Sequence, residues 1–192
     1  MRRISAADGL SLEAPENVLE LDSVNGLCGD PADPKRIAAA MFEQQRLSVC
    51  RYLLSLGLRP QVASEITQES FLRLYRHLRS NGRSENLRGW VFRVAHNLAM
   101  NELTRAGAAD AEPPECEVDP GGDPEQMLLR KERMRRMQAA MRTLPRRQQE
   151  CLHLRAEGLR YREIAGVLGM GTSSVAESIQ RALERLARIC NE

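Results

Sequence analysis

The sequence predicts an all-α protein of two small helical domains joined by a flexible acidic linker. Its 192 residues include only 4% aromatics, and valine and isoleucine are sparse beside leucine, alanine and arginine. This composition disfavours a β-sandwich or barrel and favours helices. A stretch rich in proline and glycine, without a basic residue, also interrupts the helical patterns at 106–124. The length fits one domain or two small ones.

Charge is divided sharply along the chain, although the net charge is only +2. Residues 37–105 hold 10 basic and 5 acidic side chains, and residues 125–192 hold 14 and 8. Residues 106–124 hold no basic and 6 acidic side chains. Two basic blocks separated by an acidic one suggest two modules that each meet a polyanion. Solvated arginine-rich helix surfaces are the alternative interpretation.

The domain boundaries follow from the breaks in periodicity. We expect a disordered N-terminal tail over 1–34, because proline and glycine recur there with little apolar pattern. A helical domain over 35–105 follows. An acidic linker over 106–124 leads to a second helical domain over 125–192.

Apolar spacing and helix breakers predict seven helices. In the first domain they cover 35–56, 61–78 and 87–103, separated by Gly57 with Pro60 and by the turn at 80–82. In the second domain they cover 125–142, 145–157, 161–168 and 172–190.

The sharpest local signal is a helix-turn-helix near the C-terminus. Ala165 allows close helix crossing, Gly169 supplies a left-handed turn, and Val175 seats the second helix on the first. The N-terminal residues of that second helix would face the major groove, with arginines near phosphates. A plain αα-hairpin is the alternative. The candidate DNA-contacting residues are Arg160, Tyr161, Arg162, Thr172, Ser173, Ser174, Ala176, Glu177, Ser178, Arg181 and Arg185.

Two stretches of the first domain could also bind a partner. Residues 64–74 place polar side chains on a helix with a strong apolar face, which suits a protein-docking helix or a plain exposed face. In 87–105, Trp90 and Phe92 alternate with Arg88 and Arg93. Rings beside cations suit unpaired bases, unless the rings belong to the core.

No pattern supports catalysis, a cofactor or a metal site. The three histidines are isolated, and no HExxH, GxxxxGK[ST], GxGxxG or GxSxG motif occurs. Five scattered cysteines without a CxxC pair disfavour disulfides and structural zinc. We expect no signal peptide and no membrane span. The scattered cysteines favour a reducing cytoplasm, and the missing catalytic motifs predict that the protein is not an enzyme.

Three segments occur in this order along the chain: 64–74, 87–105 and the helix-turn-helix. Together they resemble the sigma factors of bacterial RNA polymerase, in particular the extracytoplasmic-function (ECF) type. The resemblance covers about 38–105 and 127–189, as a sigma region 2-like bundle and a sigma region 4-like helix-turn-helix. It implies a core polymerase-binding helix with Glu65, Thr67, Gln68, Glu69, Phe71, Leu72 and Arg73. It implies that Arg88, Trp90, Phe92, Arg93, His96, Asn97 and Asn101 read the minus-ten element. The helix-turn-helix residues named above would read the minus-thirty-five element.

The resemblance also implies partners and a role. The partners are core RNA polymerase (its β′ clamp helices and β flap), promoter DNA and an anti-sigma factor, with no small-molecule substrate. The role is promoter-specific initiation, of the kind used in stress responses. The family usually has Lys and Arg where Ala176, Glu177 and Ser178 stand, and an acidic residue where Asn101 stands. A stand-alone helix-turn-helix regulator and a polymerase-binding adaptor with weak DNA contact are the alternatives.

Overall fold

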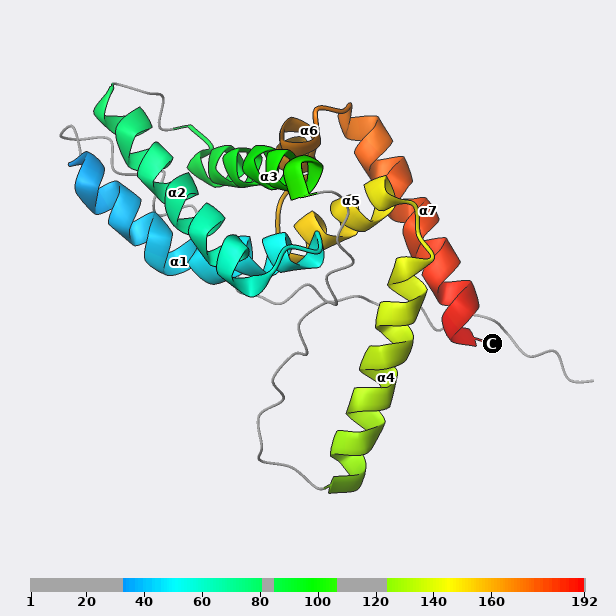
Figure 1. Ribbon diagram of the computed structural model, residues 1–192. Helices are drawn as coiled ribbons and strands as arrows, with labels where there is room; N and C mark the ends of the chain where they lie inside the picture. Colours follow the sequence, from blue (N-terminus) through cyan, green and yellow to red (C-terminus); the bar gives the residue numbers. More distant parts are fainter. Residues whose placement is uncertain (1–32, 81–84, 107–123, 192) are drawn as a thin grey trace, which may run out of the picture. The chain divides into compact units, whose positions relative to one another are not determined.

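The computed structural model describes residues 33–80, 85–106 and 124–191, and these parts hold helices and no strand. Each helix begins and ends within three residues of its predicted bounds. In chain order they are α1 (Pro34–Ser55), α2 (Pro60–Arg79), α3 (Leu87–Ala106), α4 (Pro124–Arg142), α5 (Arg146–Ala156), α6 (Tyr161–Leu168) and α7 (Thr172–Asn191) (Figure 1).

Local chemistry fixes where the decisive helices start and stop. The Asn86 side chain caps α3, since its Oδ1 accepts a hydrogen bond of 3.1 Å from the Gly89 backbone N–H. A Cβ on Gly89 would lie 2.7 Å from that side chain, so glycine permits the cap. Gly169, with φ of +64°, ends α6 in the left-handed conformation that a tight turn needs.

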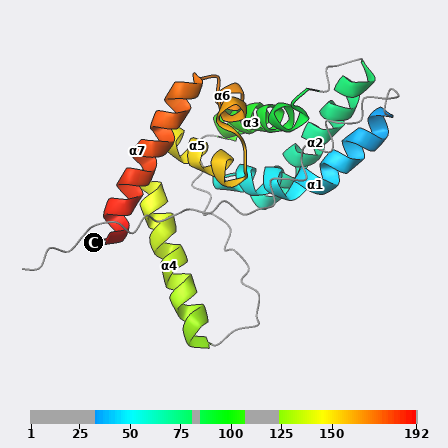
Figure 2. The same ribbon diagram turned by 180° about the vertical axis from the view of Figure 1, so that it is seen from behind.

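The two predicted domains pack on each other. Helices α1, α2 and α3 form one bundle, α5, α6 and α7 form another, and α3 lies against α6 (Figures 1 and 2). Buried side chains form one continuous cluster from Val49 and Leu53 of α1 through Phe92 of α3 to Ile164 of α6. A smaller cluster joins α4 to α7. Residues 34–192 form one compact unit.

The expected tail and linker fall almost entirely outside the described residues, as do positions 81 and 82 of the expected turn at 80–82. Among the described helices, none combines the length and the apolar character that crossing a bilayer requires.

A buried polar pair lies within this core. The Tyr52 hydroxyl of α1 and His96 Nδ1 of α3 share a hydrogen bond of 2.8 Å. Burial lowers the pKa of His96 below its usual 6.5, while the nearby Glu150 carboxylate acts in the opposite direction. Burial also raises the pKa of Tyr52 far above its ordinary range. Both groups are therefore neutral at physiological pH.

Replacing Phe92 should strongly destabilise the fold. This side chain is fully buried, so Phe92→Ala should lower the free energy of unfolding by about 3–5 kcal/mol in urea titrations. Arg93→Ala, an exposed neighbour on the same helix, should change it by less than about 0.5 kcal/mol. Equal midpoints for the two variants would contradict the burial of Phe92.

Acidification should destabilise the protein through His96 and His153. Below pH 6.5 the unfolded chain protonates its histidines, whereas His96 and His153, with lowered pKa values, resist protonation in the folded state. The unfolded state then binds more protons, so the free energy of unfolding should fall as the pH drops below 6.5. Urea unfolding of wild type and His96→Gln across pH 7.5–5.5 tests this. The variant should have a shallower slope, and equal slopes would count against His96.

Candidate polymerase and nucleic-acid interfaces

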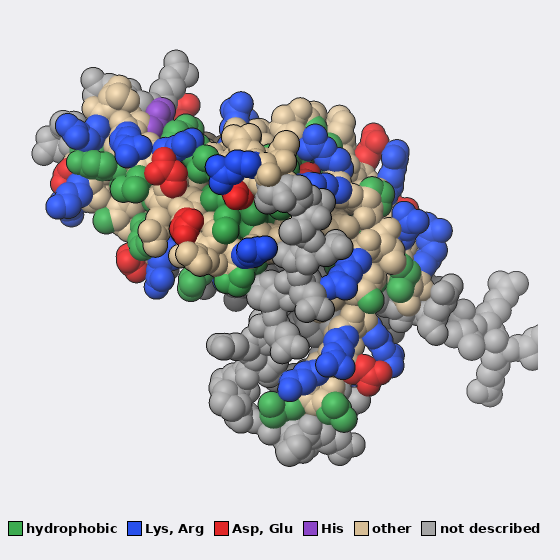
Figure 3. All heavy atoms as spheres, in the orientation of Figure 1, with side chains coloured by type: hydrophobic (Ala, Val, Ile, Leu, Met, Phe, Trp, Pro, Cys, Tyr) green, Lys and Arg blue, Asp and Glu red, His purple; other side chains and the backbone are tan. Residues whose placement is uncertain are grey.

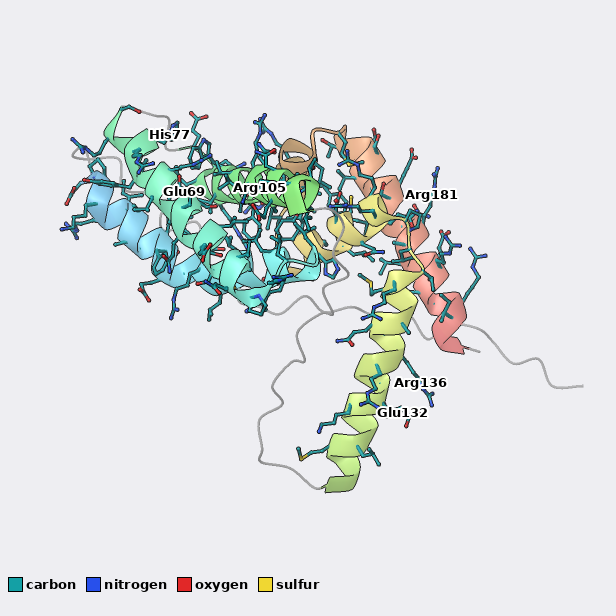
Figure 4. The ribbon with its side chains drawn as sticks, viewed as in Figure 1. Glu69, His77, Arg105, Glu132, Arg136 and Arg181 are labelled. Carbon is teal, nitrogen blue, oxygen red and sulfur yellow. The ribbon has the colours of Figure 1, made fainter. Side chains whose placement is uncertain are left out.

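Helix α2 presents a polar stripe on the side that faces away from α1. Its exposed members recur at helical spacing, from Glu65 and Gln68 to Leu72 and Arg73. Leu72 is 51% exposed, a large apolar side chain surrounded by polar ones. Glu69 joins the stripe and accepts a hydrogen bond of 2.8 Å from Arg73 Nε (Figure 4). That bond lowers the pKa of Glu69. This face suits contact with a protein surface of mixed polarity.

Two residues expected on this docking surface face inward instead. Thr67 is buried, and its hydroxyl donates to the Ala63 carbonyl oxygen within the helix. Phe71 is 5% exposed, and its ring meets that of Phe42 edge to face at 5.2 Å. Phe71 packs α2 against α1, and because both side chains are buried, neither is available to a partner in this structure.

Helix α3 has one polar face and one buried face. Trp90, Arg93, Asn97 and Asn101 lie on one side of the helix, because their spacing of three or four residues matches the helical repeat. Arg93, Asn97 and Asn101 are exposed. Trp90 is half-buried and stacks on His77 of α2, with ring centroids 4.8 Å apart. A ring held in place beside a cation and two amides can stack on a base and hydrogen-bond to it.

Three other residues expected to read DNA lie elsewhere on α3. Phe92 is fully buried and His96 is 7% exposed, so neither ring can accept a base in this structure. The Arg88 guanidinium is half-buried and donates to the backbone carbonyl oxygens of Glu157 and Gly158. The sequence left open whether Trp90 and Phe92 belong to the core, and the structure buries Phe92 but only half-buries Trp90.

Helices α6 and α7 form the predicted helix-turn-helix. The Met170 backbone N–H donates to the Ala165 carbonyl oxygen at 3.1 Å, which closes the turn around Gly169. Val175 is fully buried and Ile179 is 5% exposed, so one face of α7 is seated on the first helix. At the start of α6, the Arg160 backbone N–H donates to Glu163 Oε2 at 2.7 Å.

The opposite face of α7 is open to solvent. Ala176 is half-buried at its edge, while Tyr161 on α6 is 39% exposed. Ser178, expected to contact DNA, is half-buried on the packed side of α7, where its side chain hydrogen-bonds with the buried Cys151 thiol of α5. Glu177 pairs with Arg181 at 3.2 Å, which offsets its negative charge where lysine or arginine was expected (Figure 4). Basic side chains are spread over the α4 and α7 side of the face shown in Figure 3. The exposed residues of the predicted set are Arg160, Tyr161, Arg162, Thr172, Ser173, Ser174, Glu177, Arg181 and Arg185.

Sequence reasoning missed the contacts between the two bundles. Arg51 of α1 forms an ion pair with Glu157, 106 positions further along the chain. No motif or periodicity predicts such a pair, because the sequence pattern places both residues on solvent-exposed helix surfaces. Among the described residues, no group of three or more His, Cys, Asp or Glu side chains is placed to hold a metal.

Comparison with known proteins connects both bundles to one family. The family model for sigma-70 region 2 matches residues 41–109, and that for sigma-70 region 4 matches 134–186. The first match contains α2 and α3, and the second contains the helix-turn-helix.

Curated relatives show the same relationship over both regions. The chain is 30% identical over 137 residues to the ECF RNA polymerase sigma-E factor of Salmonella typhimurium, covering 64% of this chain and 70% of that protein. It is 30% identical over 141 residues to the RNA polymerase sigma-H factor of Pseudomonas aeruginosa, covering 66% and 72%. With the ECF sigma factor SigE of Mycolicibacterium smegmatis, identity is 31% over 129 residues, covering 65% of this chain but only half of that protein.

Solved structures share the fold. The sigma factor RpoE of Bartonella quintana, solved in complex with the anti-sigma factor NepR, superimposes with a TM-score of 0.62 at 17% identity, covering 80% of this chain and 96% of that one. CnrH, solved with the cytosolic domain of CnrY, gives 0.57 at 19% identity, covering 82% and 89%. With both regions present in order, this chain belongs to the ECF-type sigma factors of RNA polymerase, proteins that direct promoter-specific transcription initiation and are not enzymes.

Proposed function

We propose that this chain binds core RNA polymerase through the exposed stripe of α2 and reads two promoter elements with its two regions. The observation that carries the proposal is the division of α3. Its inner face is buried, while Arg93, Asn97 and Asn101 remain exposed beside the half-buried Trp90. A helix surface of this kind can hold unpaired bases without disturbing the core behind it.

The minus-ten element is the target that this α3 surface suits. Strand opening exposes bases, and stacking on an aromatic ring returns about 1–3 kcal/mol per base. Arg93 can contact the phosphate backbone, and the amides of Asn97 and Asn101 can hydrogen-bond to base edges. Because Phe92 and His96 are buried, reading of this element depends on Trp90, Arg93, Asn97 and Asn101.

The minus-thirty-five element is the target of the helix-turn-helix. The exposed first turn of α7, with Thr172, Ser173 and Ser174, supplies hydroxyl groups for base edges in the major groove. Arg181 and Arg185 can meet phosphates further along the helix. Neutralising phosphates releases counterions, so the complex should weaken steeply with added salt.

The proposed partners follow from these surfaces and from the family. Core polymerase, through its β′ clamp helices and β flap, and promoter DNA are the primary ones. An anti-sigma factor is a further proposed partner, since both RpoE and CnrH were solved with a bound protein. The cytoplasm, where polymerase and promoters are found, is the proposed location, and no small-molecule substrate is needed.

Run-off transcription tests the proposed function. Core polymerase with this protein should yield promoter-dependent transcripts from genomic fragments of the same organism. The variant Arg93→Ala with Asn97→Ala should lower transcript yield by about tenfold or more, because contacts to the opened strand are lost. Its binding to core enzyme should not change, since these side chains lie away from the α2 stripe.

Binding and transcription assays also distinguish a sigma factor from a stand-alone regulator and from an adaptor. Tight binding to palindromic duplex DNA without polymerase would favour a stand-alone regulator. Binding to core enzyme without a footprint on DNA would favour an adaptor. Failure to support promoter-dependent transcription on any genomic fragment would exclude a functional sigma factor.

A charge placed on the α2 stripe should prevent docking. Leu72→Glu keeps the bundle intact because Leu72 is 51% exposed, yet it puts a carboxylate at the centre of the stripe. We expect at least a tenfold weaker affinity for core polymerase in pull-down or fluorescence titration. Leu128→Glu is the matched control, since Leu128 on α4 is 67% exposed. Equal affinities of the two variants would place the docking surface elsewhere.

A further inference from the structure

The chain's single tryptophan is stacked on a histidine from another helix. Trp90 lies in the first turn of α3, and His77 lies in the last turn of α2 (Figure 4). Their ring centroids are 4.8 Å apart, and the ring planes differ by 21°. Aromatic rings in this near-parallel geometry attract each other. The imidazole of His77 therefore covers one face of the indole.

This stack differs from a ring contact in the core of the same bundle. Tyr52 and Phe92 meet with ring centroids 5.8 Å apart, and both side chains are fully buried. Trp90 and His77 are both only half-buried. Burial of apolar surface accounts for the core pair, whereas the Trp90 pair leaves part of each ring at the surface. What His77 adds is a flat ring parallel to the indole, and not a large buried area.

The stack restricts how the indole can turn. A tryptophan side chain rotates about two bonds, and a ring that lies parallel against one face opposes both rotations. Ordering a mobile side chain on binding costs free energy, and a side chain that is already held avoids that cost. An unpaired base that stacks on Trp90 uses the part of the ring that His77 leaves open.

The last turn of α2 also carries the charge that suits a nucleic acid. Arg76 and Arg79 lie in this turn with His77, and both are exposed. Together with Ser80 they line an open hollow on the surface. Guanidinium groups at such a surface can contact phosphates. Through the stack of His77 on Trp90, this cationic turn is joined to the polar face of α3.

We propose that His77 is a positioning residue for promoter opening: its imidazole holds the Trp90 indole in the orientation that receives an unpaired base of the minus-ten element. This inference rests on the proposed function, because that function makes Trp90 the ring on which a base stacks. His77 acts through Trp90 and needs no contact of its own with DNA. Its place in the sequence does not reveal this role, since the contact depends on how α2 packs beside α3.

Fluorescence tests the position of Trp90 without DNA or polymerase. Because Trp90 is the only tryptophan, its emission in the full-length protein reports on this one ring. His77→Ala should raise the acrylamide quenching constant by about twofold or more, because removal of the imidazole uncovers one face of the indole. The same variant should lower the emission anisotropy, since the freed ring can turn.

Two further variants separate stacking from hydrogen bonding by His77. His77→Phe keeps a flat ring without ring nitrogens and should retain the wild-type quenching constant. His77→Gln keeps a polar side chain without a ring and should behave like His77→Ala. His153→Ala is the matched control, since it removes another half-buried imidazole from α5. Circular dichroism confirms folding, and His77→Gln carries the comparison if His77→Ala loses helix.

Promoter opening then tests the consequence for function. Holoenzyme is formed with core polymerase on the genomic fragment that gives the strongest run-off transcript, and permanganate reactivity of unpaired thymines measures opening. His77→Ala and His77→Gln should open this fragment about threefold to tenfold more slowly than wild type, because the indole must be ordered while it captures the base. His77→Phe and His153→Ala should match wild type.

A double-variant cycle shows whether His77 acts through Trp90. Trp90→Ala alone should slow opening, and His77→Ala should have no further effect in that background. Fully additive effects of the two changes would refute the positioning role. Affinity for core polymerase should be the same for all of these variants, because His77 packs toward α3 and does not belong to the α2 stripe.

The remaining outcomes separate this proposal from the proposed function. The proposal is overturned if His77→Ala leaves the quenching constant unchanged, or if His77→Gln matches wild type while His77→Phe does not. A freed indole with an unchanged rate of opening would refute the role of His77 and leave the sigma function intact. If wild-type holoenzyme opens no fragment, the proposed function fails and the promoter role of His77 fails with it, whereas the fluorescence still decides whether His77 holds Trp90.

Discussion

Burial of one face of α3 is the constraint on which the rest of the structure depends. Phe92, Ala95 and Ala99 are fully buried against other helices, so the opposite side of α3 must face solvent. That division leaves Arg93, Asn97 and Asn101 exposed and holds Trp90 against His77. A rigid support fixes the polar surface in place, and a nucleic-acid strand can then bind it without reorganising the core.

The same buried face also connects the two regions. Because α3 contacts α6 as well as α1 and α2, it cannot be covered fully by its own bundle. The apolar cluster therefore runs without a break from the first bundle into the second, and α3 is the helix that both bundles share.

The residue types on α7 affect how far its proposed DNA binding depends on base edges and how far on charge. Thr172, Ser173 and Ser174 occupy the first turn. Ala176, Glu177 and Ser178 follow, where the resemblance leads us to expect lysine and arginine, and Glu177 pairs with Arg181. In the proposed DNA complex, phosphate contacts fall to arginines further along α6 and α7. Under that proposal, binding depends more on base edges and less on charge than it does for a lysine-rich recognition helix.

Sequence alone determined the seven helices, the helix-turn-helix and the family resemblance. These depend on local spacing: Ala165, Gly169 and Val175 lie within eleven positions, and caps and breakers act over a single turn. Tertiary structure decided which side of each helix is buried, and it buries Thr67, Phe71, Phe92 and His96, four residues to which the resemblance gave binding roles. It also paired Arg51 with Glu157 across 106 positions. Periodicity constrains neighbours on one helix, whereas contacts between helices depend on how whole surfaces fit, which no short sequence window contains.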